Sequence, residues 1–584
     1  MTIAQDSIDP RAVAHAWLTA FADAITNGDV TGIVDTFLPF GWFKDVLTFT
    51  WNFRSLEGPE KISAYLSDSG KFAPGYISSV KPYEDRWVRP SAVPAGKQTS
   101  VEVPFTYETP VAVGKGYARL LEGPEGRWKA LSVCMFLTDL KGHEEQQFES
   151  GIYGGHTLAW ADVYAERRLK VETDPQVLIV GSSQVGMTVA AVCKQNGYRA
   201  LLIEKTPRVG DIWRNRYPTL ALHTTRRQHE LLYQPYPTTW PQFTPKDKFA
   251  DWSESYALHQ DLVVWTSSQI DGKPVYHEDS RRWDVTINRN GTKATVHPTY
   301  IVMATGGLGS PVLVPLPGFS EFKGTTLHAQ DYRGGISYEG KNVVVVGAAN
   351  SSIDICQDLC FHKAKSVTMI QRSATCVIGG ETVEKHLMEI FKDDEPSTVG
   401  DLKFTTLPLG LYKKLEMART QEMWEADKEL FDKLRKGGLK LYMGPNGEGQ
   451  SVMAFERGGG YWIDKGGADL IARGEIKVKQ GTEPSAYTPS GLKFKDGSEL
   501  EADVVIFATG FMTIRETALK IFGEDTLKNI GRLHGLDQEG EFNAFRPSGH
   551  PGLWFATGAA SIARMLSKPL VIQLKALDLG LMTL

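Results

Sequence analysis

Short apolar runs of strand length, each followed by a glycine-bearing turn and then by apolar positions at helical spacing, organise the central part of the chain. Residues 177–180 are such a run, and a turn over 181–186 leads into a periodic segment that ends at Asn196. A second apolar run then closes on an acid, Glu204. This pattern predicts a strand–turn–helix–strand unit with a phosphate-binding turn at the start of its helix.

The same pattern recurs further along the chain. Residues 342–346 are a β-branched run, 347–352 form the turn, and a helix is expected through Leu359. The next strand, 367–371, ends at Arg372 instead of an acid. An acid at this position suits a ribose diol, and an arginine suits a 2′-phosphate. The pair of units therefore predicts FAD binding in the first and NADPH binding in the second.

The first 150 residues follow a different pattern. Arg11–Thr26 is apolar at helical spacing, a second short helix is expected over 30–37, and strand-like runs follow. The strand-like runs are 46–53, 101–107, 117–121 and 128–138. Helices followed by a curled antiparallel sheet predict an α+β cone. Its order is similar to that of the nuclear-transport-factor-like fold. Trp42, Asp45 and Trp51 are candidates for lining a pocket in the cone, although core and surface roles without chemistry are the favoured interpretation.

The fold class predicted from these patterns is α/β, with two Rossmann-like dinucleotide-binding domains preceded by the α+β cone. The segments are expected to be the cone, a linker, the first part of the FAD domain, the NADPH domain with a helical insertion, and the second part of the FAD domain. Their limits are 1–150, 151–175, 176–320, 321–500 with the insertion at 380–465, and 501–584. Within the insertion, residues 415–434 are strongly amphipathic.

Composition narrows the class of protein. A net charge of −5 on 584 residues does not indicate binding to nucleic acid or a basic patch that would bind a membrane. The five cysteines form no C-x-x-C pair, which fits a reducing cytosol and argues against a disulfide reductase. The start of the sequence lacks a signal pattern, and no apolar run has transmembrane length. We therefore expect a cytoplasmic protein without an integral membrane segment.

Both turns depart from the G-x-G-x-x-G pattern. Ser183 replaces the middle glycine of the first turn, while Ala349 and Ser352 replace the second and third glycines of the second turn. The Ser183 hydroxyl could donate to a phosphate, or its atoms could displace the phosphate. Ser352 is expected to loosen the packing of helix on strand.

Longer motifs make the chain resemble the flavin-containing monooxygenases, most closely the long fungal-type members with an added N-terminal domain. The F-x-G-x-x-x-H-x-x-x-Y signature is matched by 322–332, and three further matches surround it. These are 209–213, 311–318 and 508–511. Where Baeyer–Villiger members usually have tryptophan, the signature here ends in Tyr332, which favours heteroatom or carbon hydroxylation.

The resemblance implies a reaction. NADPH reduces FAD, oxygen adds at the flavin C4a, and the hydroperoxide transfers one oxygen atom to a small apolar metabolite. Molecular oxygen and the substrate are the expected partners, with a homodimer left open. The cofactor carries the chemistry, so no metal site and no catalytic side chain are assigned. His328 is read as structural, linking two domains. Ala559 stands where fungal relatives often have an acid facing the flavin, and the family's asparagine is not evident in 222–225.

The candidate cofactor-binding residues lie in the two turns, at the ends of the two units and in the matched motifs. They are Gly181, Ser183, Gln184, Gly186, Glu204, Lys205, Asp211, Trp213, His223, Thr224, Gly347, Ala349, Asn350, Ser351, Arg372, Ala508, Thr509 and Gly510. The alternative to an active oxygenase is a scaffold with degenerate cofactor turns. Such a scaffold would work as a non-redox cyclase or isomerase, or as a binding protein in which the cone mediates dimerisation.

Overall fold

The computed structural model describes residues 8–584, and its N-terminal part is a seven-stranded sheet with three helices. The strand order is β2-β1-β7-β6-β5-β3, with β4 paired to β5. The strands are β1 Phe37–Val46, β2 Phe53–Glu57, β3 Ser78–Pro82, β4 Ser91–Ala95, β5 Gln98–Glu108, β6 Ala112–Glu122 and β7 Trp128–Leu140. The helices are α1 Pro10–Thr26, α2 Val30–Asp35 and α3 Gly58–Asp68.

One predicted strand of this region is wrong, and one helix was missed. Residues 46–53 are mostly a loop between β1 and β2, and α3 had no predicted counterpart. Asp45 explains the loop: its carboxylate accepts hydrogen bonds from the backbone N–H groups of Thr48 at 2.9 Å and Phe49 at 3.0 Å. Tyr65 of α3 donates to the same carboxylate at 2.5 Å. Asp45 therefore fixes a buried loop, which is a structural role of the kind that the sequence favoured.

The first parallel sheet has the order β10-β9-β8-β15-β28, so it combines central strands with one from the C-terminal region. Its strands are β8 Val177–Val180, β9 Ala200–Ile203, β10 Val263–Trp265, β15 Tyr300–Met303 and β28 Leu553–Phe555. Helices α5 Gln184–Gln195 and α18 Ala560–Asp578 pack against each other beside it. The predicted first strand–turn–helix–strand unit is confirmed as β8, α5 and β9.

Connecting elements surround this first sheet. The helices are α4 Trp160–Thr173, α6 Asp211–Arg214, α7 Arg226–His229, α8 Lys246–His259 and α17 Ile514–Leu527. Strands β11 Ser268–Ile270, β12 Val275–His277, β13 Arg282–Arg289 and β14 Thr292–Val296 form a small antiparallel sheet. β16 Leu308–Pro311 pairs with β27 Phe511–Thr513.

The second parallel sheet has the order β17-β26-β18-β19-β22. Its strands are β17 Thr325–His328, β18 Asn342–Val346, β19 Ser366–Gln371, β22 Ile476–Gln480 and β26 Val504–Phe507, and α9 Asn350–Phe361 packs on it. The second predicted unit is thus confirmed as β18, α9 and β19. The boundary predicted at residue 501 falls too early, because β26 pairs with β17 and β18 of the second sheet and not with the first sheet.

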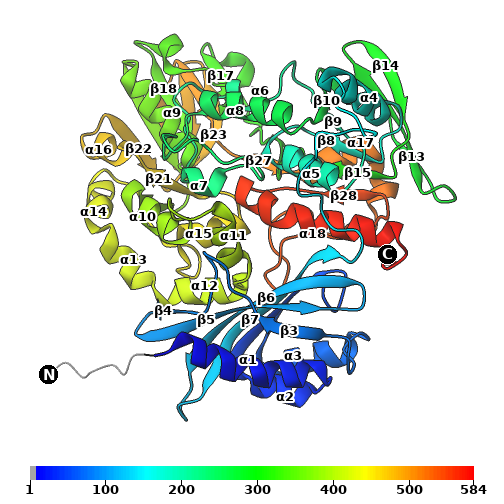
Figure 1. The fold of residues 1–584 in the computed structure, drawn as a ribbon. Helices are drawn as coiled ribbons and strands as arrows, with labels where there is room; N and C mark the ends of the chain where they lie inside the picture. Colours follow the sequence, from blue (N-terminus) through cyan, green and yellow to red (C-terminus); the bar gives the residue numbers. More distant parts are fainter. Residues whose placement is uncertain (1–7) are drawn as a thin grey trace.

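A helical insertion follows β19, as predicted, although its amphipathic stretch is not one continuous helix. The helices are α10 Gly380–Ile390, α11 Ser397–Thr405, α12 Leu409–Ala418, α13 Thr420–Ala426, α14 Lys428–Lys436 and α15 Gly449–Glu456. The remaining elements are β20 Cys376–Gly379, β21 Tyr461–Asp464, α16 Gly467–Ala472, β23 Pro484–Thr488, β24 Gly491–Phe494 and β25 Glu499–Glu501. Figure 1 places the insertion, in yellow-green, between the second sheet and the N-terminal sheet.

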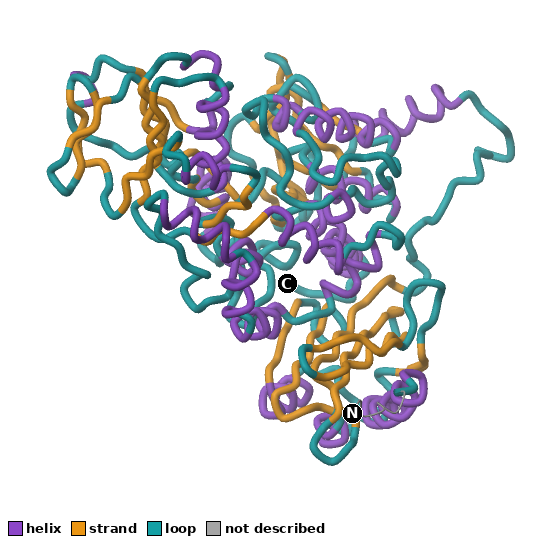
Figure 2. The backbone as a smooth tube through the Cα atoms, turned by 90° about the vertical axis from the view of Figure 1, so that its left-hand side faces the viewer, coloured by secondary structure: helices purple, strands orange, loops and turns teal. Residues whose placement is uncertain are grey.

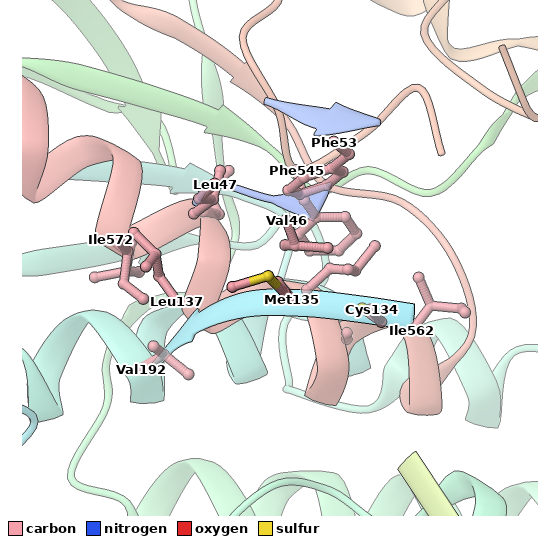
Figure 3. Close-up of a cluster of buried hydrophobic side chains, with 14 of the residues drawn as sticks. Val46, Leu47, Phe53, Cys134, Met135, Leu137, Val192, Phe545, Ile562 and Ile572 are labelled. Atoms are coloured by element: carbon pink, nitrogen blue, oxygen red, sulfur yellow. The ribbon is translucent and has the colours of Figure 1, made fainter. Parts of the chain in front are cut away.

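The N-terminal sheet docks onto α18. Figure 3 shows Met135 and Leu137 of β7 with Ile562 and Ile572 of α18, all four in one buried apolar cluster. At the rim of this contact, Trp51 donates from Nε1 to a backbone carbonyl of the C-terminal tail at 2.9 Å. Burial of apolar surface stabilises such a contact by roughly 25 cal/mol per Å². The sheet therefore acts as a support for the long C-terminal helix.

The linker leaves the N-terminal sheet and reaches α4 by a route away from the rest of the molecule (Figure 2). Its large apolar side chains Ile152 and Leu158 are exposed, as is Phe148 just before it. Among the helices of residues 8–584, none combines the length and apolar character needed to cross a bilayer.

Candidate functional site

The turn after β8 depends on two glycines. Gly181 has a φ of +105°, and a Cβ built on it would lie 2.7 Å from the carbonyl oxygen of Ala304. A Cβ on Gly186 would lie 1.9 Å from the carbonyl oxygen of Gly181. Side chains cannot be accommodated at such distances from backbone atoms, so both positions require glycine.

Ser183, at the altered middle position, fits the turn without strain. It is the N-cap residue of α5 with extended backbone, at φ −76° and ψ −179°, and its side chain contacts the Gln184 amide and not the helix backbone. The N-terminal N–H groups of α5 thus have no side-chain cap. Free N–H groups and the positive end of a helix attract anions such as a pyrophosphate.

Glu204, at the end of β9, is buried and held by four hydrogen bonds. Ser182 donates to Oε2 from its backbone N at 3.1 Å and from Oγ at 3.0 Å. Thr206 donates to Oε1 from its backbone N at 3.0 Å and from Oγ1 at 2.9 Å. Only 8% of Glu204 is exposed, whereas Lys205 is exposed to solvent. The carboxylate is therefore fixed in one orientation at the end of the first unit.

The turn after β18 has one glycine that a side chain could not replace. Gly347 has a φ of +132°, and a Cβ built on it would lie 2.5 Å from the carbonyl oxygen of Ala508. Ala349 is the N-cap of α9 and provides no side-chain cap. Ser352 is fully buried, and its Oγ has no partner among residues 8–584. The serine is enclosed in the packing, and the loosening of helix on strand stays a prediction.

Arg372, at the end of β19, contrasts with Glu204. Its side chain is 76% exposed, and Nη1 lies 3.4 Å from Oε2 of Glu483. Lys495 and then Arg372 lower the pKa of Glu483 below its usual value by hydrogen bonding. Arg372 is thus a solvated cation on a flexible side chain with a weak local partner.

The two turns face one cavity of about 280 Å³. Residues from the N-terminal ends of α5, α9 and α18 contribute to its wall: Gln184, Asn350, Ser351, Ala559 and Ala560. Three helix N-termini thus converge on one space, and each carries a partial positive charge. At the position where an acid was considered, Ala559 presents only a methyl group.

The segment after the first unit supplies the rest of the wall. The predicted residues Trp213, His223 and Thr224 all line the cavity. Sequence reasoning missed Arg216, Tyr217, Leu220, Ala221, Leu222, His229 and Phe249. The signal that could have found most of them is the run of aromatic, basic and apolar residues directly after α6.

Several polar atoms on this wall are buried without a partner among the described residues. They are Nε1 of Trp213, Nε of Arg216 and Oδ1 of Asn350. A buried donor or acceptor left unpaired costs roughly 1–3 kcal/mol. These atoms lie inside the wall, so a polar ligand such as a dinucleotide could pair with them only after the side chains rearrange.

A carboxylate bridges the two dinucleotide units at this cavity. Asp354 of α9 accepts a hydrogen bond from Tyr217 at 2.6 Å, and Nε2 of His223 lies 3.7 Å from the same oxygen. Burial, followed by the Asp354 charge, raises the pKa of Tyr217 well above its usual value. Tyr217 therefore stays protonated and ties the wall to α9.

His229 is a buried part of the wall and is neutral. Its ring nitrogens lie 3.1 Å from Oγ1 of Thr224 and 2.7 Å from Oγ1 of Thr244. Burial and the nearby Arg564 cation lower the pKa of His229 to about 3. Arg564 of α18 is itself buried and donates to both carboxylate oxygens of Asp401 at 2.7 Å.

His328 is engaged by backbone groups on both ring nitrogens. Nδ1 accepts from the N–H of Gln330 at 3.1 Å, and Nε2 donates to the carbonyl oxygen of Gly510 at 3.2 Å. Burial lowers the pKa of His328. The Nε2 contact links β17 to the loop after β26, where Thr509 donates to the Val312 carbonyl oxygen at 2.7 Å, whereas the Nδ1 contact is local. This arrangement is structural.

Some predicted residues lie outside the cavity wall. Asp211 accepts from the N–H of Arg208 at 3.1 Å and from Arg214 at 3.1 Å, so its carboxylate organises α6. The remaining predicted residues that do not line the cavity are Gly181, Ser183, Gly186, Glu204, Lys205, Gly347, Ala349, Arg372, Ala508, Thr509 and Gly510. They occupy the turns and strand ends around it.

Comparison with known proteins identifies similar sequences. The family described as "Flavin-binding monooxygenase-like" matches residues 174–389. The chain is 30% identical over 359 residues to the probable indole-3-pyruvate monooxygenase YUCCA3 of Arabidopsis thaliana, covering 60% of this chain and 76% of the relative. It is 29% identical over 377 residues to YUCCA7 of the same plant, covering 63% and 80%.

Solved structures agree on the fold. An oxidized steroid monooxygenase bound to NADP superposes with a TM-score of 0.52 at 17% identity. The match covers 70% of this chain and 86% of that protein. At this identity, the likeness shows a shared fold.

Proposed function

Because the chain belongs to the flavin-binding monooxygenase-like family, we propose that it uses FAD and NADPH to insert one atom of molecular oxygen into a small apolar metabolite. The observation that carries the proposal is the shared cavity. Residues from both glycine turns and from the N-terminus of α18 meet there. Two dinucleotides whose reactive rings must approach each other require this arrangement.

The first unit supplies the residues that would hold FAD. The N-terminal N–H groups of α5, beside Gly181 and Gly186, suit its pyrophosphate. Glu204 suits the adenosine ribose, with its carboxylate held in place by Ser182 and Thr206. Trp213 and Arg216 contribute to the wall of the same cavity.

The second unit supplies the residues that would hold NADPH. The α9 N-terminus, with Asn350 and Ser351 on the cavity wall, suits the pyrophosphate. Arg372 is a solvated guanidinium at the strand end, and guanidinium groups bind phosphate with paired hydrogen bonds. Arg372 would therefore distinguish NADPH from NADH.

The protein's own part in the reaction is to bind, orient and exclude water. When bound, the flavin accepts a hydride from NADPH and activates molecular oxygen. Leu220, Leu222 and Phe249 give the cavity an apolar wall that limits water at the flavin. His328 is neutral with both nitrogens engaged, so its role is to fix the loop carrying Gly510.

The finer assignments extend this proposal to the whole chain. We assign the N-terminal region to a nuclear-transport-factor-like cone, and the chain to the long fungal-type form in a cytoplasmic setting. The sheet over β1–β7 with α1–α3 supports the cone, and its packing on α18 supports a fixed position beside the flavin domain.

The proposal is tested by the visible absorption spectrum of the purified protein, before and after NADPH is added without oxygen. We expect bound flavin absorption that bleaches with NADPH and returns with oxygen. Colourless protein that does not take up added FAD would overturn the assignment. That result would favour a non-redox role for the scaffold.

A further inference from the structure

A second cavity of about 280 Å³ lies where the N-terminal sheet meets α12, α15 and the loop over 536–540. Trp42 of β1, Tyr412 of α12 and Phe455 of α15 contribute aromatic rings, and Val452 and Leu536 add apolar surface. It shares no lining residue with the cavity between the two glycine turns. It is therefore a separate space, formed only when the N-terminal domain is docked.

The aromatic walls are held in place by close packing. A Cβ built on Gly410 of α12 would lie 2.5 Å from Cη2 of Trp42, so the absent side chain lets the indole approach the helix. Phe455 lies between Phe404 and Phe542, with ring centroids at 5.5 Å and 6.0 Å. Rigid rings around a cavity favour a ligand that also has a flat apolar face.

The acidic residues of the wall are neutralised within the protein. Glu456 pairs with Lys413 at 2.6 Å, and Asp537 pairs with Arg546 at 2.6 Å. The other two acids pair with cations as well: Glu539 with Arg54 at 2.7 Å, and Glu57 with Lys414. Lys61, the remaining charged lining residue, is exposed to solvent. With its four acids paired and Lys61 exposed to solvent, the interior favours an uncharged ligand.

We propose that this interdomain cavity binds a neutral small molecule that carries one or two fused rings. An apolar cavity of about 150 Å³ holds benzene, so this cavity has room for a two-ring molecule. Trp42 comes from the N-terminal domain and the other rings from the helical insertion. The added domain therefore takes part in ligand recognition as well as in packing.

The wall of the cavity continues to the flavin sheet through His534, which precedes Leu536 by two residues. A Cβ built on Gly307 would lie 2.4 Å from Nδ1 of His534, so the imidazole covers the chain just after β15. Both ring nitrogens are buried without a partner among the described residues. The carboxyl ends of parallel strands are where ligands bind in α/β sheets. The loop that lines this cavity is thus connected, through His534, to the edge where the flavin is proposed to lie.

The proposal is tested with 2-naphthol, a neutral two-ring probe, on the full-length protein labelled with 5-fluorotryptophan. The ¹⁹F signal of Trp42 is assigned by its loss in Trp42→Phe. We expect 2-naphthol to shift this signal saturably. Val452→Trp fills the cavity and is expected to raise the probe's dissociation constant by about tenfold or more, with flavin content unchanged.

Leu222→Trp is the matched control because it fills the cavity between the glycine turns instead. It is expected to lower flavin content and to leave probe binding within twofold. Val452→Phe, a smaller change, replaces Val452→Trp if that variant does not fold, as judged by its melting transition. A Trp42 signal that does not move with 2-naphthol, or equal binding by wild type and the filled variant, would overturn the proposal. Flavin content reports separately on the proposed oxygenase.

Discussion

The two dinucleotide units share a topology but differ in how tightly they are built. In the first turn, a Cβ on Gly186 would lie 1.9 Å from a backbone oxygen, whereas the second turn encloses the Ser352 side chain at the matching position. The first unit ends in buried Glu204 with four hydrogen bonds. The second ends in Arg372, which is 76% exposed and has one weak partner.

This difference suits two ligands that stay bound for different lengths of time. A buried, preorganised carboxylate loses little conformational entropy when a ligand binds, which favours long residence. An exposed arginine must give up rotamer freedom of about 2 kcal/mol when it closes on a phosphate. The first unit is thus suited to a cofactor that stays bound through many turnovers. The second is suited to a cofactor that enters and leaves in each cycle.

The largest expected effect tests the packing of the two turns. Gly186→Val places a side chain against the carbonyl oxygen of Gly181, and backbone atoms cannot move away cheaply, so we expect protein that lacks flavin or does not fold. Ser352→Ala, at the matching position, removes a buried hydroxyl without a partner and is expected to keep or raise Tm. Flavin per chain and thermal unfolding measure both. Normal flavin content in Gly186→Val would contradict the comparison.

The next effect tests the buried end of the first unit. Glu204→Gln replaces one acceptor oxygen with an amide group, which then faces either the donors of Ser182 or those of Thr206. The change also removes the charged acceptor proposed for the ribose hydroxyls; because a hydrogen bond to a charged group is worth roughly 1.5–3 kcal/mol, we expect FAD affinity to fall by about 100-fold. Titration of the apoprotein with FAD measures this. Thr206→Ser keeps the hydroxyl and is expected to bind FAD as wild type does. If Glu204→Gln bound FAD with the affinity of wild type, Glu204 would not be part of the FAD site.

Sequence patterns predicted the two units because each depends on local chemistry. Glycine turns, β-branched strands and the residue that ends each unit are neighbours along the chain, and β8, α5, β18 and α9 appear at the expected positions. The strand expected over 46–53 failed because Asp45 draws the backbone N–H groups of an apolar segment into a loop. An apolar pattern indicates that side chains are buried, but it does not by itself show that they lie on a strand. Here the buried residues form a loop.

Contacts between distant segments could not be predicted in this way. The four donors around Glu204 depend on side-chain rotamers, and the cavity wall from Arg216 to Leu222 depends on where a loop returns. Docking of the N-terminal sheet on the C-terminal region joins residues more than 400 positions apart, such as Lys44 and Glu541, whose charged atoms lie 3.0 Å apart. No periodicity in either segment encodes its partner.

Lowering the pH is expected to affect His229, on the cavity wall, but not Arg372, at the end of the second unit. His229 has a folded pKa of about 3, below its ordinary value of 6.5, so the unfolded chain binds a proton that the folded chain does not. The stability that depends on neutral His229 is fully present above about pH 6.5. Between pH 6.5 and pH 3, the free energy of unfolding falls by about 1.4 kcal/mol for each unit of pH. At pH 5 the loss is about 2 kcal/mol. Arg372 stays charged throughout this range.

The measurement is the free energy of unfolding from urea titrations at pH 7 and pH 5, for wild type and His229→Gln. The glutamine keeps a polar contact toward Thr244 but cannot titrate, so its loss between the two pH values should be smaller by about 2 kcal/mol. Equal losses in both proteins would show that His229 is accessible to protons in the folded state.

The smallest effect tests the exposed end of the second unit. Arg372→Gln removes the cation proposed to meet the 2′-phosphate, so we expect KM for NADPH to rise about tenfold while KM for NADH and flavin content stay unchanged. Arg372→Lys keeps a positive charge but lacks the planar guanidinium group, so its KM for NADPH should lie between those of wild type and Arg372→Gln. Glu483→Gln frees Arg372 from its weak partner and should lower KM for NADPH by about twofold or less, as expected for an exposed ion pair. Steady-state oxidation of both nucleotides measures the series. If Arg372→Gln raised both KM values equally, the second unit would bind the cofactor without reading its 2′-phosphate, and the contrast with Glu204 would concern rigidity alone.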